Sequence, residues 1–379
     1  MKRKNDKARV VRKGVVALVA TAAVLLTSAC TSEGQSSSEE GVVTLSVASF
    51  LIDGTPNADM VNWYLDKVEA DSEGSIVFDR FPAESLCTGA EIVECVTDGR
   101  ADLGITVPSY NPDKFPLMNL AALPFMTDDN QAMMNAFYTL YEENEEFAAE
   151  SGALGLRNVA YWPAGASIFG STTEINSVDD LEDVRIRAVG DGLLLAMNNA
   201  GASPVALTAG EMYEGVERGV IDAVANNMDA PISYKLTEVL PNWTDSGYGH
   251  YISIGMWISQ DAYDSLSEKQ QNVVDNAREA LVSGEGMAVF ATTAATQCDY
   301  MLDQEGVSVT RWSDSAISEF KKLTGDQAST DWIEQATSYG VSDAPAVLDR
   351  YEELLAEGAA DSESRVAPLA ECAERFASR

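Results

Sequence analysis

The chain has 379 residues, of which 60 are Asp or Glu and 25 are Lys or Arg, so its formal net charge is −35. A field this negative repels nucleic acid and anionic lipid headgroups, which excludes both as partner surfaces. The sequence contains one histidine and five cysteines, so residues typical of catalytic and metal sites are scarce.

The first 29 residues predict a signal peptide. A basic run, MKRKNDKARVVRKG, precedes VVALVATAAVLL, an apolar run too short for a membrane span. The small residues of LTSAC lead to Cys30 and resemble a bacterial lipobox, in which the cysteine is acylated. The alternative is cleavage nearby, with Cys30 incidental. Residues 30–41 are rich in Ser, Gly and Glu and predict a lipid anchor followed by a flexible tether.

Loss of residues 1–29 leaves 18 basic and 59 acidic residues, a net charge of −41. Such a surface suits high salt, where screening suppresses self-repulsion. We take a saline habitat as a hypothesis.

The next elements alternate between strand and helix. We expect strands over 42–50, 75–81 and 102–107, with helices over Asn57–Ala70 and Gly89–Asp98 between them. This order is typical of an α/β protein. A second set has strands over 154–162, 166–172, 183–189, 203–207 and 220–226 and helices over 192–200 and Ala209–Arg218.

A strand-like segment over 248–259 precedes a long helical pattern. Ser267 and Gln270 form a capping box, and the pattern continues without proline to about Gln304, broken only by Gly284 and Gly286. One continuous helix of this length would extend about 55 Å. Short helices are expected from Ser313 to Arg379. About 340 residues suit two domains, which we place at 42–164 with about 253–290, and at 165–252 with about 291–379.

Four cysteines remain beyond Cys30, and in an exported protein they predict disulfides. We favour Cys87 with Cys95, and Cys298 with Cys372. Four buried thiols are the alternative.

The sequence offers little catalytic chemistry. Its single histidine, His250, lies in a strand-like segment with no Ser-His-Asp order or HExxH spacing, and we interpret it as structural. No phosphate-binding loop or dinucleotide fingerprint is present. We therefore expect no enzyme activity, no cofactor and no metal site.

Two arginines stand out in this acidic chain. If 183–189 is a strand, Arg185 and Arg187 share one face, and guanidinium groups suit bidentate binding of a carboxylate. The alternative is that both arginines face solvent and pair with nearby acids, namely Asp179, Asp180, Glu182 or Asp183.

Several segments, in order, resemble the solute-binding proteins of the tripartite ATP-independent periplasmic (TRAP) transporters. They are FPAES, EIVECVTDGRADLGI, SVDDLEDVRIRAVG, GASPVALTAGEMYEGVERGVID and SQDAYDSLSEKQQNVVDNAREA. The resemblance covers about Thr44 to Gly306. It implies an α/β, two-lobed fold like that of periplasmic binding proteins, with a ligand cleft between domains and a long helix spanning both.

The resemblance also implies which residues bind the ligand. The arginine matching Arg187 holds a carboxylate in this family, and Asn226 matches an asparagine that assists it, with Asn227 as the alternative register. Candidate walls of the cleft are Trp162, Tyr110, Phe50 and Trp257, and the alternative for each is a place in the core. We favour Trp162 because it leads directly into the segment that matches the family's ligand loop. Ser167, in that segment, is also expected at the ligand.

Departures from the family pattern narrow the expected ligand. Ser167 and Ala90 stand where the family often has further arginines, and Ala209 replaces a common aromatic residue. A single arginine suggests a small monocarboxylate rather than a highly charged acid.

The resemblance implies a monomer that delivers its ligand to TRAP permease subunits. It would lie at the outer face of the cytoplasmic membrane and contact the membrane only through its lipid anchor. The alternatives are a ligand-sensing module for a membrane kinase, the binding protein of an ATP-driven importer, and an extracellular enzyme.

Overall fold

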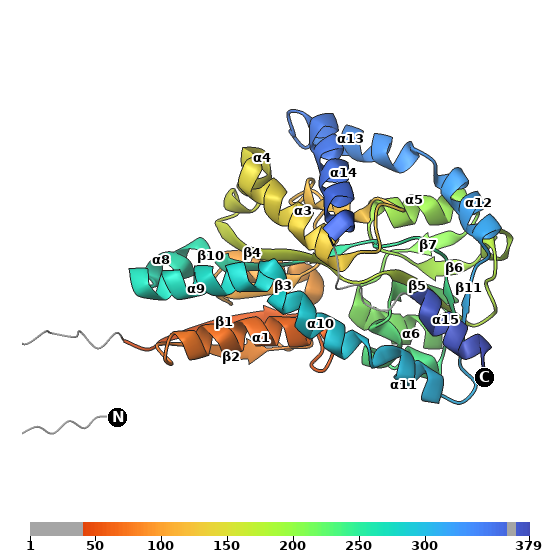
Figure 1. Cartoon of the computed structure of the whole chain (residues 1–379), viewed down its shortest axis with the longest axis horizontal. Helices are drawn as coiled ribbons and strands as arrows, with labels where there is room; N and C mark the ends of the chain where they lie inside the picture. Colours follow the sequence, from red (N-terminus) through yellow and green to blue (C-terminus); the bar gives the residue numbers. More distant parts are fainter. Residues whose placement is uncertain (1–40, 362–368) are drawn as a thin grey trace, which may run out of the picture. The chain divides into compact units, whose positions relative to one another are not determined.

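The structure, a computed structural model, describes residues 41–361 and 369–379 and contains two β-sheets (Figure 1). The first sheet has the strand order β2-β1-β3-β10-β4. Its strands are β1 (Val43–Ser49), β2 (Ile76–Phe81), β3 (Leu103–Thr106), β4 (Leu156–Pro163) and β10 (Ser253–Ser259). Strand β1 is parallel to β2 and β3, whereas β10 is antiparallel to β3 and β4. We call this sheet and its helices the first lobe.

The second sheet has the order β11-β9-β5-β8-β6-β7. Its strands are β5 (Ser167–Ser171), β6 (Arg185–Arg187), β7 (Ser203–Val205), β8 (Ala223–Asn227), β9 (Asn242–Asp245) and β11 (Ser308–Arg311). Strand β6 is parallel to both β7 and β8, so the ends of β6 and β8 lie side by side. We call this sheet and its helices the second lobe.

Amphipathic helices cover both sheets. They are α1 (Pro56–Asp71), α2 (Ile92–Thr97), α3 (Asn130–Glu143), α4 (Glu145–Gly152), α5 (Asp191–Asn199), α6 (Met212–Glu217), α7 (Ala230–Ser233), α8 (Gln260–Ser265), α9 (Glu268–Ala280), α10 (Gly286–Ala294), α11 (Gln297–Asp303), α12 (Asp314–Thr324), α13 (Gln327–Ser338), α14 (Ala344–Asp361) and α15 (Leu369–Ala377). In α1, Thr55 caps the first turn by accepting from the Ala58 N–H, and Pro56 occupies a position where no donor is needed.

Two chain crossings connect the lobes. One runs from β4 to β5, the other from β9 to β10, and a backbone bridge between Ala166 and His250 joins them. His250 is buried, and burial lowers the pKa of its imidazole. The strands divide between the sheets near residues 164 and 252. We expected residues 291–379 to belong to the second domain. Helix α14, within this range, packs instead on α3 of the first lobe, where Phe137 and Tyr351 stack.

The expected continuous helix from Ser267 to Gln304 is wrong. The capping box of Ser267 and Gln270 is present, but the segment is divided into α9, α10 and α11. Gly284 has φ of 121°, which lies outside the helical region and which side chains with a Cβ rarely adopt. The three helices nevertheless extend from α1 of the first lobe to α7 of the second (Figure 1).

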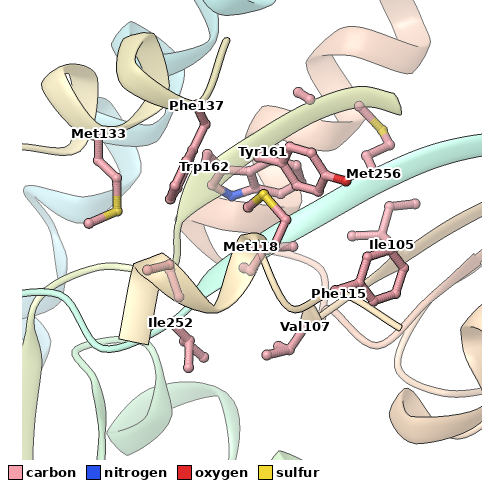
Figure 2. Packing of buried hydrophobic residues seen from close by; sticks show 14 of the residues in the cluster. Ile105, Val107, Phe115, Met118, Met133, Phe137, Tyr161, Trp162, Ile252 and Met256 are labelled. Carbon is pink, nitrogen blue, oxygen red and sulfur yellow. The ribbon is translucent and has the colours of Figure 1, made fainter. Parts of the chain in front are cut away.

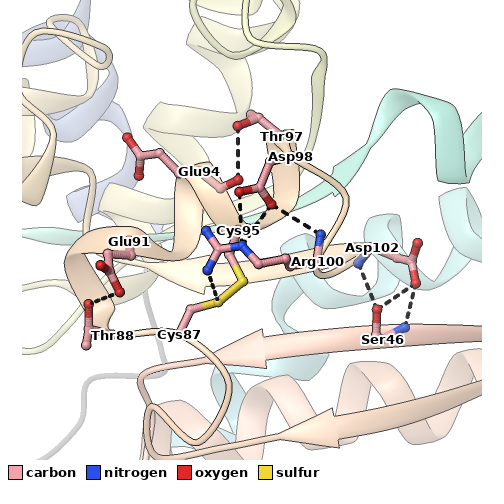
Figure 3. The surroundings of a disulfide bond; sticks show 10 residues. All are labelled: Ser46, Cys87, Thr88, Glu91, Glu94, Cys95, Thr97, Asp98, Arg100 and Asp102. Atoms are coloured by element: carbon pink, nitrogen blue, oxygen red, sulfur yellow. Dashed lines mark hydrogen bonds and ion pairs between the residues drawn. A yellow bond between two sulfur atoms is a disulfide. The ribbon is translucent and has the colours of Figure 1, made fainter. Parts of the chain in front are cut away.

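Both expected disulfides are present. Cys87 is bonded to Cys95 in α2, close to β3 (Figure 3). Cys298 in α11 is bonded to Cys372 in α15, which packs on β11. The second bond closes a loop of 74 residues and fixes the C-terminal helix to the second lobe.

The predicted signal peptide, Cys30 and, apart from Gly41, the tether lie outside the described residues. Within 41–361 and 369–379, no helix combines the length and the apolar character needed to cross a bilayer.

Candidate functional site

Arg187 is the last residue of β6 and has only 1% of its surface exposed. Its Nε donates to the Leu207 carbonyl at 2.9 Å, and its Nη1 donates to the Ala225 carbonyl at 3.1 Å. Within the described part of the chain, no carboxylate lies within 4.0 Å of this guanidinium. A buried cation whose neighbours are neutral groups still lacks a counter-charge.

Arg185, which we expected to flank the ligand-binding position, has a different environment from Arg187. Its guanidinium is exposed and pairs with Asp222, with Nη2 to Oδ1 at 2.5 Å. That hydrogen bond also lowers the pKa of Asp222. None of the four nearby acids considered as partners forms this pair, because the start of β6 lies beside the start of β8, where Asp222 is located.

The first lobe contributes two aromatic residues to the space around Arg187. Phe50 follows β1, and Tyr110 follows β3, with their rings 6.5 Å apart in an edge-to-face arrangement. The Tyr110 hydroxyl accepts a 3.2 Å hydrogen bond from the Ala209 N–H of the second lobe. Burial raises the pKa of Tyr110, although the nearby Arg187 opposes that shift.

Asn226 and Asn227 end β8, the strand beside β6, and line the same space. The Asn226 Oδ1 accepts from the Tyr251 hydroxyl at 2.6 Å and from the Asn227 N–H at 2.8 Å. The Asn227 Nδ2 donates to the Ala164 carbonyl in the crossing between lobes. Both asparagines are therefore held in fixed orientations.

These residues line one cavity of about 40 Å³ between the lobes. Its lining includes Phe50, Tyr110, Arg187, Asn226 and Asn227, so five of the seven predicted ligand residues are brought together. A space of this size holds only a few water molecules. Entry of an organic ligand therefore requires the lobes or lining side chains to move apart.

Trp162 and Ser167 do not line this cavity. Trp162 is fully buried in the core, as Figure 2 shows, and its Nε1 donates to the Asn57 Oδ1 at 2.9 Å. Ser167 is buried at the start of β5. Trp257, also considered as a wall, stacks on Phe115 at 5.0 Å and belongs to the core of the first lobe.

Several lining residues were not predicted from the sequence. The important polar ones are Asn57, Asp229, Tyr234 and Tyr251. Tyr251 lies in a segment recognised as strand-like, but a single sequence does not tell which aromatic residue faces a cleft. Asp229 was one of 59 acids in the chain after residue 29 and carried no distinguishing signal.

A larger cavity of about 590 Å³ lies on the other side of Asn227 and Asp229. Its lining contains Arg311 and Asp245, which form an ion pair with each other. This pair neutralises part of the charge that lines the larger cavity. We therefore place the functional site at the smaller cavity, where Arg187 has no paired carboxylate among the described residues. No group of three His, Cys, Asp or Glu side chains suitable for a metal ion occurs among the described residues.

Comparisons with known proteins agree with this architecture. Residues 47–331 match the family model of the bacterial extracellular solute-binding proteins, family 7. The chain is 26% identical to the ectoine-binding periplasmic protein TeaA of Halomonas elongata over 298 residues, covering 78% of this chain and 85% of that protein. It is 22% identical to the C4-dicarboxylate-binding periplasmic protein DctP of Rhodobacter capsulatus over 286 residues, covering 75% and 81%.

A solved structure with a similar fold is a TRAP solute-binding protein from an unidentified marine microbe, specific for aromatic acids and crystallised with 3-hydroxybenzoate. It has a TM-score of 0.77, 24% identity, and coverage of 85% of this chain and all of that one. Together with the family match, this shows a two-lobed periplasmic binding protein fold. The chain therefore belongs to family 7 of the bacterial extracellular solute-binding proteins, and it is a solute-binding protein of the TRAP type.

Proposed function

We propose that this protein is an extracytoplasmic lipoprotein that captures a small monocarboxylate through an ion pair with Arg187 and delivers it to a TRAP permease. The observation that carries the proposal is a buried guanidinium that lines a cavity between the lobes and has no carboxylate within 4.0 Å in the described chain. A ligand carboxylate would supply the counter-charge that this site lacks.

The surrounding groups suit the same role. Carbonyls of Leu207 and Ala225 accept from Nε and Nη1 of Arg187, and the guanidinium has further N–H donors with which it can bind a carboxylate in the cavity that it lines. Asn226 can donate its amide to the same carboxylate or to a neighbouring hydroxyl group. Because Arg187 is the sole Lys or Arg in the lining, a single carboxylate fits the site better than two.

Closure of the lobes explains how a carboxylate is held against water. Ligand binds Arg187 and Asn226 on the second lobe, and the first lobe then brings Phe50 and Tyr110 over it. Removal of water lowers the local dielectric and strengthens the ion pair. The hydrogen bond between Tyr110 and the Ala209 N–H is one contact that forms across the lobes.

The names of the relatives support a small organic ligand, since they bind ectoine, C4-dicarboxylates or aromatic acids. We infer that the chain acts as a monomer, that Cys30 carries the lipid, and that the loaded form docks on the permease at the outer face of the cytoplasmic membrane. Ser167 and Trp162, which lie behind the cavity lining, would then act by supporting it.

The test is identification of the small molecules retained by the purified protein. Native protein and an Arg187→Ala variant are purified in parallel, denatured, and their released molecules analysed by mass spectrometry. We expect a small acid with one carboxylate from the native protein only. A ligand without a carboxylate, or equal retention by both proteins, would contradict the proposal.

A further inference from the structure

The cavity that contains Arg187 also contains a buried acid, Asp229. This residue has 8% of its surface exposed and lines the same space. Its Oδ2 accepts from the Asn57 Nδ2 at 2.5 Å, and its Oδ1 accepts from the Gln297 amide. Within 41–361 and 369–379, no basic side chain lies within 4.0 Å of this carboxylate.

Amide donors solvate a carboxylate without cancelling its charge. Burial raises the pKa of Asp229 to about 6, while the hydrogen bonds from Gln297, Asn57 and Asn227 oppose the shift. The group is therefore still mostly ionised at pH 7. A charge kept in a low-dielectric site without a counter-ion is costly, and a cation on a ligand would relieve that cost.

The two unpaired charges belong to one recognition space. Arg187 and Asp229 both line this cavity, together with Tyr234 and Tyr251. A molecule that fills the cavity therefore meets both a cation and an anion of the protein. Opposite charges at two points of a cavity favour a ligand with the complementary separation of charge.

The charge of the whole chain gives an independent reason to expect a ligand without net negative charge. At a net charge of −35, the protein repels a ligand that carries a net negative charge as it approaches. A zwitterion has no net charge and does not encounter this barrier, although it still presents a carboxylate to Arg187.

We propose that the ligand is a small zwitterion, whose carboxylate binds Arg187 and whose cationic nitrogen donates to Asp229. This inference rests on the proposed function and narrows its substrate class from monocarboxylates to those with a protonated nitrogen. Asn57 and Gln297 then act as positioning residues that hold the Asp229 carboxylate.

The experiment measures binding of two matched pairs by calorimetry at pH 7.5. L-Proline is compared with L-pyroglutamate, which has the same five-membered ring with one added carbonyl, so that its nitrogen is an uncharged lactam. 4-Aminobutyrate is compared with pentanoate, in which a methyl group replaces the ammonium. The proteins are the wild type, Asp229→Asn and Asp229→Glu, with circular dichroism melts to establish that each variant is folded.

We expect the zwitterion of at least one pair to bind wild type at least tenfold more tightly than its anionic partner. Asp229→Asn should abolish this ratio, and Asp229→Glu should retain part of it. Because the ratio compares two ligands on one protein, a general loss of stability does not change it.

If both wild type and Asp229→Asn bind the anions more tightly than the zwitterions, the inference of a zwitterionic ligand is overturned. The proposed function would still stand, and Asp229 would be a structural link between the lobes. If none of the four compounds binds, the molecule retained by the native protein tests the inference instead. A retained monocarboxylate without a cationic nitrogen overturns this inference alone, whereas a retained molecule without a carboxylate overturns both.

Discussion

Arg187 and Arg185 lie two residues apart and yet differ in burial, partners and expected role. Arg187 is covered by both lobes and held by backbone carbonyls, whereas Arg185 pairs with Asp222 in contact with solvent. Exposed pairs of this kind contribute little to stability. Arginine suits the buried position better than lysine because its planar fork keeps several donors in fixed directions.

Spacing in the sequence placed these two arginines together, but it did not separate them. The distinction arises from the neighbours that β6 acquires in the sheet, which are distant in the chain. Asp222, Leu207 and Ala225 come from other segments of the second lobe. The resemblance to a family selected Arg187, and its position in the cavity is consistent with that choice.

Glu150 in α4 offers a test of the core at residue scale. Its Oε1 accepts from the Leu117 N–H at 2.6 Å, while its Oε2 is buried and has no hydrogen-bond partner among the described residues. Burial raises the pKa of Glu150 to about 8, above the value of about 4.5 expected for the unfolded chain. Folding therefore favours the protonated acid, and stability is lost as the pH rises from about 4.5 to about 8.

We expect Glu150→Gln to remove this loss, because glutamine keeps an oxygen acceptor without a titrating proton. From pH 5 to pH 8, the free energy of unfolding of the wild type should fall by about 3 kcal/mol more than that of the variant. Urea unfolding at several pH values measures the difference. The control is Glu145→Gln, an exposed position on α4, which should follow the wild type. Parallel pH profiles for wild type and Glu150→Gln would contradict the expectation.

At the scale of elements, local signals predicted the type of most segments but not their lengths. The predicted capping box at Ser267 is present, since it depends on side chains only three residues apart. Strand β6 has three residues where seven were expected, because only Arg185–Arg187 finds partners in β7 and β8. Pairing between distant segments sets the length of a strand, so a local sequence pattern does not predict that length.

For the long helical segment from Ser267 to Gln304, local signals likewise predicted the type of element but not its length. Its helical pattern and lack of proline predicted one helix across Gly284 and Gly286, but Gly284 adopts a positive φ and the segment is divided. Helices α3 and α4, by contrast, were not predicted at all, although Asp129 caps α3 through the Ala132 N–H in the ordinary way. Their amphipathic faces became interpretable only with α14 and β4 packed against them.

For the whole molecule, the two-lobed α/β fold was predicted correctly, largely because family-like segments occur in the right order over most of the chain. The cleft was less predictable, because its lining comes from both sheets and from the crossings between them. Asp229 is an example. One acid among many gains significance only when folding buries it in the cavity that Arg187 also lines, with no basic side chain within 4.0 Å of it in the described part of the chain.

The net charge of −35 leads to a prediction at this scale. Like charges repel more strongly as the Debye length grows from about 3 Å at 1 M salt to about 10 Å at 0.1 M. We expect the melting temperature to fall as NaCl is reduced, and to approach a plateau above several tenths molar once screening is complete. Calorimetric melts from about 20 mM to about 2 M NaCl measure this. A melting temperature independent of NaCl, or one that rises steadily without a plateau, would argue against repulsion as the cause.

The claim on which the whole account depends is that Arg187 binds the ligand's carboxylate. The most direct measurement is calorimetric affinity for the molecule retained by the native protein, compared among wild type, Arg187→Ala and Arg185→Ala. Charge-assisted hydrogen bonds contribute roughly 1.5 to 3 kcal/mol each, so loss of two predicts at least about a hundredfold weaker binding by Arg187→Ala. Arg185→Ala, at an exposed ion pair, should bind within about threefold of wild type. Equal affinities for the two variants would contradict the account.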